Sequence, residues 1–504
     1  MKQVITSSQK RRIKPSGFNG ASSVLNRLGI SMLEVGLCAV VFIGCILLHF
    51  VPVYTRLGLP IEVGLSLISF ATPVSGLLFL SAAQVIPDVP GSPLPVAQMA
   101  LAGFFLWQLA KGKSMDLFRM GQPLWLAVAP FFVWDAGWAL VRGDYRFGLL
   151  LLFAILTGCA VATLVRKSGN RFVTCLVMIL AGQALAMCLF WMVKLHFGTP
   201  VQAFRTDLYG DSTLPGMRMG TARGNANMLG VPMALVCIGV IGWFISRPKQ
   251  NWLNGMMALL GLAAVVPPLI GSGSRGAIMS VAAGLAFLVG VRVLAGGRSY
   301  VNVLLALAGI VVVLSFGWHR LGLDEHWQEM KNRQNDQQEN TGSALAAGRT
   351  LEWTAAMNGI LNSPIIGGGS VQKLSYFDDP SMWESHSTYL DAGLTGGFPG
   401  MILFGWLVLT PILKLWRRKQ VPAIGWLLAV YAVSVISIGS TSAMQVKYFW
   451  MLWGMAAVCF TPSGARIKTR RHRAAGKVQR RGQRTEGGAQ MPEIKGQGLI
   501  VGGQ

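Results

Sequence analysis

The sequence predicts an all-α integral membrane protein, a bundle of about twelve membrane-spanning helices with one large helical loop outside the cytoplasm. Composition is the first reason: 52% of the 504 residues are hydrophobic and only 13% are charged, with a mean hydropathy of +0.50 that lies far outside soluble globular usage. The second reason is that nearly uncharged runs of 17 to 25 residues recur almost from end to end. Each run is long enough to cross a hydrocarbon core of roughly 30 Å as a helix, and lipid leaves the backbone no other partner than itself.

Thirteen apolar runs are candidate spans. Their ranges are 33–52, 61–81, 95–110, 123–141, 147–165, 172–196, 227–245, 253–270, 276–291, 299–318, 398–415, 421–438 and 444–461. Thirteen spans would place the basic N-terminus on the outer face, against the positive-inside rule. The run at 57–81, which Pro60, Glu62 and Pro73 interrupt, is therefore expected to be re-entrant or half-inserted, which leaves twelve spans with both termini inside.

Basic residues mark every second short connection and so orient the helices. These residues are Lys111, Lys113 and Arg119; Arg166, Lys167 and Arg171; Arg247 and Lys249; Arg292 and Arg298; and Lys414, Arg417, Arg418 and Lys419. By the positive-inside rule these connections are cytoplasmic. The net charge of +24 would suggest a nucleic-acid partner in a soluble protein, but here it lies in tails and alternate loops. The sequence therefore predicts contact with membrane lipids and no nucleic acid.

Five regions follow from this pattern: a basic cytoplasmic arm at 1–30, transmembrane helices at 31–318, a large outer loop at 319–397, transmembrane helices at 398–461, and a basic, disordered cytoplasmic tail at 462–504. Within the loop, Trp353, Ala356 and Ile360 are spaced as on one face of a helix, and Pro364 ends it.

Three spans enter the membrane from the outer face directly after unusual polar sequences, at 217–227, 271–276 and 386–400. A helix N-terminus offers unpaired N–H groups and a positive dipole end, and an arginine fork matches phosphate oxygens. Two such ends with Arg218 and Arg275 would suit a diphosphate. The alternative is that Arg218, Arg223 and Arg275 are interfacial anchors at the lipid headgroups.

His386 stands among hydroxyl residues in the middle of the outer loop, where a neutral imidazole would suit the abstraction of a proton from a sugar hydroxyl. Asp135 lies in the middle of a span, where an ionisable group is costly, and it is open to a helix-packing role or a proton site. The cysteines form no CxxC pair, and the pair Asp378 and Asp379 has no further ligand at metal spacing. No metal or cofactor is expected.

These residues resemble the superfamily of O-antigen ligases and polymerases, bacterial membrane glycosyltransferases, over roughly residues 200–405. The pieces that carry the resemblance are Arg218 with Gly220, Thr221 and Asn227; Ser274-Arg275-Gly276-Ala277; Gly348-Arg349 with Trp353; Ser363-Pro364 with Gly367 and Gly369; and His386 with Tyr389-Leu390. Ser387 stands where many relatives carry Asn, and Arg223 is an additional cation.

The resemblance implies an enzyme of the bacterial inner membrane whose large loop is periplasmic. It would transfer an undecaprenyl-diphosphate-linked glycan to a hydroxyl acceptor, either lipid A core or a growing glycan, without a metal. His386, Arg275 and Arg218 would be catalytic. Substrate contacts are implied for Arg223, Asn227, Arg349, Tyr389 and Gly276.

Two alternatives stay open. A polymerase of the same superfamily would extend repeat units, whereas a ligase, the favoured interpretation, would move finished polysaccharide onto lipid A core. A transporter or flippase for a lipid-linked substrate is the hypothesis of another class, motivated by Asp135 and the number of helices.

Overall fold

The structure is a computed structural model. It describes residues 31–50, 55–84, 86, 95–111, 122–143, 145–169, 171–197, 204–205, 218–219, 226–246, 252–272, 274–294, 308, 328, 331, 349–368, 387–439 and 447–459. The chain divides into two units, Met1–Val458 and Cys459–Gln504, and every contact discussed below lies within the first.

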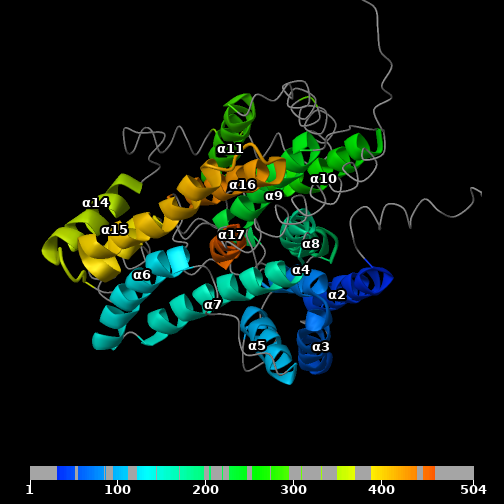
Figure 1. Cartoon of the computed structure of the whole chain (residues 1–504), viewed down its shortest axis with the longest axis horizontal. Helices are drawn as coiled ribbons and strands as arrows, with labels where there is room; N and C mark the ends of the chain where they lie inside the picture. The colour runs from blue at the N-terminus through cyan, green and yellow to red at the C-terminus, as the bar shows by residue number, and fades with distance from the viewer. Residues whose placement is uncertain are drawn as a thin grey trace, which may run out of the picture. The chain divides into compact units, whose positions relative to one another are not determined.

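The described residues form fourteen α-helices, one 3₁₀ helix and two short strands (Figure 1). In chain order they are α2 (Met32–Phe50), α3 (Thr55–Ile68), η1 (Ser69–Ala71), α4 (Pro73–Ala82), α5 (Val96–Ala110), α6 (Gln122–Val141), α7 (Tyr145–Lys167), α8 (Phe172–Phe197), β1 (Phe204–Arg205), β2 (Arg218–Met219), α9 (Ala226–Ser246), α10 (Trp252–Gly271), α11 (Arg275–Leu294), α14 (Arg349–Asn362), α15 (Thr388–Trp416), α16 (Pro422–Ile438) and α17 (Lys447–Val458). The predicted helical architecture is confirmed, with two additions. The strands β1 and β2, which were not predicted, pair antiparallel with Arg205 opposite Arg218.

Two helices are long and apolar enough to cross a bilayer by length and composition, Gly148–Lys167 and Thr388–Trp416. The other apolar helices have 10 to 17 residues where their side chains are described. The expected number of twelve spans therefore stays a prediction, and the run at 299–318 lies outside the described residues apart from position 308.

The run at 57–81 is two helices rather than one span. α3 ends at Ile68, the 3₁₀ turn η1 follows, and α4 begins at Pro73 with Thr72 as its N-cap. The Thr72 hydroxyl accepts from the Ser75 N–H at 3.3 Å, which satisfies one of the N–H groups that a helix start leaves unpaired. The segment is interrupted as expected, at the turn Ser69–Ala71, and its re-entrant or half-inserted placement in the membrane stays a prediction.

Glycine allows close contact between neighbouring helices. A Cβ atom at Gly454 of α17 would lie 2.1 Å from the Gly158 carbonyl oxygen of α7, and one at Gly103 of α5 would lie 2.2 Å from the Ser66 carbonyl oxygen of α3. The driving force for association of helices in lipid is close packing, so small residues at these crossings are what a membrane bundle needs.

The second part of α15 carries an exposed apolar stripe. Ile402, Trp406, Leu409 and Leu413 follow one another at helical spacing and are between 50% and 70% exposed, whereas Phe404 and Leu407 are buried on the opposite face. A soluble bundle would place polar side chains on its outer face, and a lipid-facing helix places apolar ones there. The stripe agrees with a helical membrane protein.

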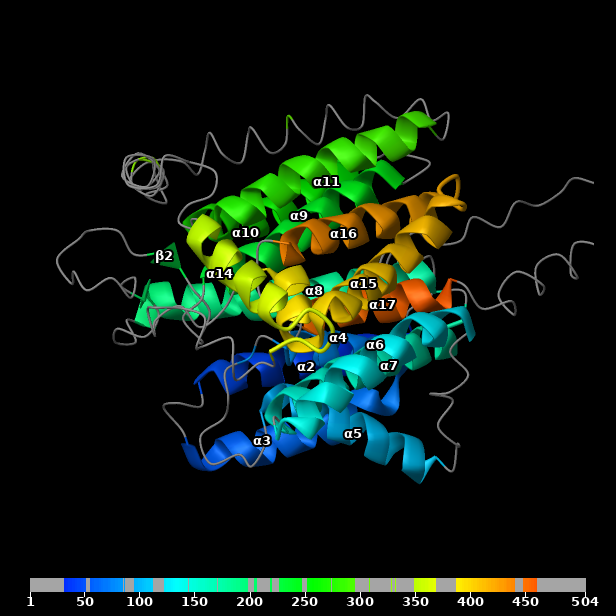
Figure 2. The same cartoon turned by 90° about the vertical axis from the view of Figure 1, so that its left-hand side faces the viewer.

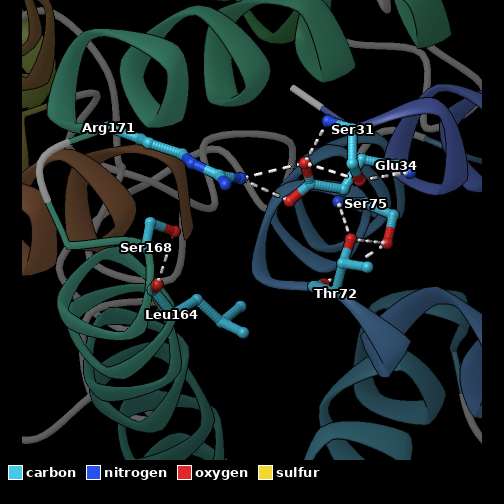
Figure 3. A network of polar contacts seen from close by, with 7 residues as sticks. All are labelled: Ser31, Glu34, Thr72, Ser75, Leu164, Ser168 and Arg171. Atoms are coloured by element: carbon cyan, nitrogen blue, oxygen red, sulfur yellow. Dashed lines mark hydrogen bonds and ion pairs between the residues drawn. The ribbon is translucent and has the colours of Figure 1, made fainter. Parts of the chain in front are cut away.

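An ion pair ties the start of α2 to the connection between α7 and α8 (Figure 3). Arg171 Nη1 lies 2.7 Å and 2.9 Å from the two carboxylate oxygens of Glu34, which also accepts from the Ser31 N–H at 2.8 Å. Lys167, at the end of α7, donates to Gln108 near the end of α5. The start of α2 and the ends of α5 and α7, which all adjoin basic segments, therefore lie at one end of the bundle.

Candidate functional site

The N-termini of α9 and α11 meet. A Cβ atom at Gly230, in the second turn of α9, would lie 2.7 Å from Ser272 Oγ, 2.8 Å from Ser274 Cβ and 2.9 Å from Ala277 Cβ. The absence of a side chain at Gly230 thus permits direct contact between the two helix starts. The strand β2, which holds Arg218, contacts both α9 and α10.

Two serines shape the entry to α11. Ser272 Oγ donates to the Leu269 carbonyl oxygen at 2.6 Å and accepts from the Ser274 N–H at 3.2 Å. Ser274 Oγ in turn accepts from the Ala277 N–H at 3.3 Å, as an N-cap does. The predicted helix start at Ser274-Arg275-Gly276 is therefore confirmed as the beginning of α11.

The third predicted entry is the start of the second helical part of α15. The sequence placed a helix start at residue 398, and α15 consists of two helical parts that meet at a kink at Gly397, so the second part begins where expected. The first part, from Thr388 to the kink, was not predicted as a helix. The helix is interrupted at Gly397, whose φ of +66° lies in the left-handed region that favours glycine. The glycine-rich segment is consequently a break inside a helix rather than a loop leading to one.

Side chains in α6 and just beyond its end donate hydrogen bonds to backbone carbonyl oxygens at this break. Pro399 has no N–H and so cannot bond to the Thr395 carbonyl oxygen four residues before it. Arg142 Nη1, just beyond the end of α6, donates to that oxygen at 3.0 Å, and Trp134 Nε1 donates to the Gly396 carbonyl oxygen at 2.7 Å. Broken helices in membranes persist where neighbours supply such partners.

The turn that follows α14 packs into the same break. The Phe398 N–H donates to the Pro364 carbonyl oxygen at 2.8 Å, and a Cβ atom at Gly367 would lie 2.6 Å from the Gly397 nitrogen. The second guanidinium nitrogen of Arg142 donates to the carbonyl oxygens of Ile366 and Gly367, the latter at 2.5 Å. We call this junction of α6, the turn at 363–368 and the first part of α15 the α15 break.

Asp135 is fully buried beside the same junction. Its Oδ2 lies 3.2 Å from Thr395 Oγ1, and its Oδ1 faces the backbone at Gly396 and Gly400, where an added Cβ atom would lie 2.1 Å and 2.8 Å away. At positions 396 and 400, only glycine leaves room for the Asp135 carboxyl group. Of the two roles left open for Asp135, helix packing is the one that these contacts describe.

The start of α15 is linked to α11 through the end of α16. A Cβ atom at Gly439 would lie 3.8 Å from Tyr389 Cε2, and Ser437 Oγ donates to Ser280 Oγ in α11 at 2.9 Å. The N-termini of α9, α11 and α15 thus lie at one end of the bundle. Figure 2 shows α9, α11 and α16 alongside one another, with α14 and α15 beside them.

This end is opposite the end that holds the Glu34 and Arg171 pair. α7 runs from Tyr145, three residues after Arg142, to Lys167, which precedes Arg171. A helix of 23 residues is roughly 34 Å long at 1.5 Å per residue, about the thickness of a hydrocarbon core. The three helix entries and the basic ends of α5 and α7 are therefore separated by the length of a membrane span.

The predicted site residues are described to different extents. His386 and Arg223 lie outside the described residues, and Arg218, Asn227, Arg275 and Arg349 are placed by their backbone only, in β2, α9, α11 and α14. Gly276 lies in the first turn of α11. The Tyr389 ring packs against Phe404, with a centroid distance of 5.4 Å. The structure thus brings the segments of Arg218, Asn227 and Arg275 together and leaves the role of each side chain a prediction.

Sequence reasoning missed Arg142 and Trp134. The sequence held a signal for Arg142, which is a cation in a connection that is not one of the predicted cytoplasmic connections. A second signal is Pro399, which leaves a carbonyl oxygen without its usual helical partner. Pairing the two needed the fold, since more than 250 residues separate them in the sequence. Among the described residues, no group of three His, Cys, Asp or Glu side chains is placed to hold a metal ion.

A family model described as O-antigen ligase matches residues 268–405. On the basis of this similarity, we call residues 268–405 the O-antigen ligase domain. The domain comprises the end of α10, the serine-capped start of α11, α14 and the α15 break. The predicted superfamily is confirmed, over residues 268–405 rather than the expected 200–405. Arg218, Arg223 and Asn227 precede the match. No curated protein matches the chain.

Proposed function

We propose that the chain is an O-antigen ligase, which transfers an undecaprenyl-diphosphate-linked glycan to a hydroxyl of lipid A core at the periplasmic face of the bacterial inner membrane. The observation that carries the proposal is the placement of three helix N-termini at one end of the bundle, two of them inside the O-antigen ligase domain. The family match supports glycan transfer as the class of reaction, and the helix N-termini support a substrate that carries a diphosphate.

The diphosphate would bind where α9 and α11 begin. Each helix start presents unpaired N–H groups and the positive end of a dipole, and their contact at Gly230 places the two starts side by side. Arg218 in β2 and Arg275 at the first position of α11 would add two cations, with Asn227 and Gly276 beside them and Arg223 as a further cation. Two cationic helix ends match a dianionic group better than one does.

In the reaction, the acceptor hydroxyl oxygen attacks the anomeric carbon of the glycan, and the bond from that carbon to the diphosphate oxygen breaks. The hydroxyl proton passes to the imidazole of His386, and the diphosphate leaves with the bonding electron pair. Negative charge on the diphosphate grows in the transition state, so arginines held in place beforehand stabilise the transition state more than the bound substrate. Arg349 and Tyr389 would contact the glycan or support the loop.

Deletion of the gene tests the proposal against its nearest alternatives. Loss of a ligase leaves long lipid-linked polysaccharide and an unmodified lipid A core. Loss of a polymerase leaves core that carries single repeat units. Loss of a flippase leaves undecaprenyl-linked units on the cytoplasmic leaflet, where periplasmic enzymes do not reach them. Unchanged lipopolysaccharide would contradict all three.

A further inference from the structure

Arg142 binds the chain on both sides of the segment that carries His386. One nitrogen donates to Thr395 in α15 at 3.0 Å, and the other donates to Ile366 and to Gly367 in the turn after α14, the latter at 2.5 Å. The mechanism proposed above gives Arg142 no role, and Arg142 lies outside the family match.

An arginine suits this position because the three acceptors named above are backbone carbonyl oxygens. Thr395 has no helical partner, since Pro399 stands four residues later, and Ile366 and Gly367 follow the end of α14. A guanidinium group has five N–H donors in a rigid plane and no acceptor, so one side chain serves several carbonyls in fixed geometry. The Arg142 side chain also lies over the Trp138 ring, 5.7 Å from its centroid, which limits its movement.

We propose that Arg142 is a positioning residue for the acceptor half of the transfer. It holds the turn at 363–368 against the first part of α15, and so it sets the place of the helix start at Ser387 and Thr388 relative to α11. This inference rests on the proposed function. The proposed diphosphate site at the starts of α9 and α11 is held by other contacts, between Gly230 and the serines Ser272 and Ser274. Arg142 therefore acts on catalysis and acceptor use rather than on binding of the diphosphate.

Arg142→Met and Arg142→Lys test the inference, with Arg171→Met as the matched control. Methionine keeps the apolar stem and removes every donor, whereas a lysine ammonium restores the charge and some of the hydrogen bonds. Arg171 is a second arginine at a helix end, and it pairs with Glu34 at the opposite end of α7. The full-length variants are purified in detergent and compared with the wild-type protein at matched monodispersity.

Hydrogen exchange is the readout that does not depend on enzyme activity. In Arg142→Met we expect exchange to rise at least tenfold in peptides covering 363–368 and 388–400, with a smaller rise in Arg142→Lys. Arg171→Met should leave these peptides unchanged. Equal exchange in the wild type and in Arg142→Met would overturn the inference, whatever the activity of the protein.

Kinetics with a prenyl-diphosphate-linked glycan and a lipid A core acceptor give the second readout. In Arg142→Met we expect kcat to fall at least tenfold with an unchanged KM for the donor, and Arg142→Lys should recover part of the loss. A normal kcat despite faster exchange would contradict a positioning role, and a raised donor KM with normal kcat would assign Arg142 to the diphosphate. A wild-type protein without transfer activity would contradict the proposed function itself. It would also contradict the role of Arg142, because that role is defined for the transfer reaction.

Discussion

The Arg142 guanidinium, just beyond the end of α6, donates a hydrogen bond of 3.0 Å to the Thr395 carbonyl oxygen in α15, an oxygen that Pro399 leaves without its helical partner. This contact joins a helix outside the O-antigen ligase domain to the break inside the domain. The interruption at Gly397 therefore has a specific partner in the fold, and the same guanidinium group also binds the turn at 363–368.

Gly397→Ala is expected to destabilise the protein by about 1–3 kcal/mol. Gly397 has a φ of +66°, and an added Cβ atom would lie 2.5 Å from the Pro364 carbonyl oxygen, so alanine meets both backbone strain and a collision. Thermal unfolding in detergent measures the change. Gly405→Ala, in the same helix with no atom within 4 Å of the added Cβ, is the control and should raise stability by about 0.5–1 kcal/mol. Similar effects of the two substitutions would refute the assignment of a strained break.

Gly230→Ala should weaken binding of the donor. Its Cβ atom would lie 2.7 Å from Ser272 Oγ, so the starts of α9 and α11 would have to separate. We expect the KM for a prenyl-diphosphate donor to rise roughly tenfold, which corresponds to ~1.4 kcal/mol, with a smaller effect on the KM for the acceptor. Gly255→Ala in α10, where the added atom meets nothing within 4 Å, should behave as wild type. A folded Gly230→Ala protein with normal donor KM would argue against a diphosphate site between these helix ends.

Asp135→Asn should preserve both fold and transfer activity. Asparagine has the same shape and keeps a hydrogen bond to Thr395 Oγ1, so we expect a change in unfolding free energy of about 1 kcal/mol or less. Asp135→Lys, which places a larger charged group against Gly396 and Gly400, should prevent folding. A folded Asp135→Asn protein that has lost function in cells would instead support a proton-coupled transporter.

The position of the N-terminal arm can be tested by labelling with cysteine reagents. Because Glu34 at the start of α2 pairs with Arg171, single cysteines at Lys14 and Ser168 should be on the same, cytoplasmic side of the membrane. A cysteine at Val141, which is 75% exposed at the end of α6 and close to the start of α7, should be on the outer side. In a background without the native cysteines, a membrane-impermeant maleimide added to intact cells should label only the Val141→Cys protein. Labelling of the Lys14→Cys protein in intact cells would contradict this topology.

Much of the helical pattern was predictable because spans in lipid must be apolar over a fixed length, as for α5, α9 and α16. The bend at Ser69–Ala71 was foreseen only as an interruption, since Pro60 and Pro73 indicate a break without saying which way the chain turns. The first part of α15, from Thr388 to the kink, was not predicted because Gly393, Gly396 and Gly397 resemble a loop in sequence. Gly393 and Gly396 are helical because α14 and α6 pack against them, and such packing is set by tertiary contacts rather than by local preference.

The site was predictable to the extent that its residues share a local pattern. Ser274-Arg275-Gly276 has the polar and glycine residues of a capped helix start, and it proved to be one. The contact of that start with Gly230 and the role of Arg142 depend on which helices are neighbours, and no short segment encodes that information.

The most direct test of the proposed function is a transfer assay with the purified protein. Wild-type protein given an undecaprenyl-diphosphate-linked glycan and a lipid A core acceptor should form glycosylated acceptor without added metal. His386→Ala and Arg275→Ala should lose at least 99% of the turnover, and both should retain the monodispersity and melting temperature of the wild type. We expect Arg171→Met, at the opposite end of the bundle, to remain active. Undiminished turnover in both the His386→Ala and Arg275→Ala proteins would contradict the proposed site.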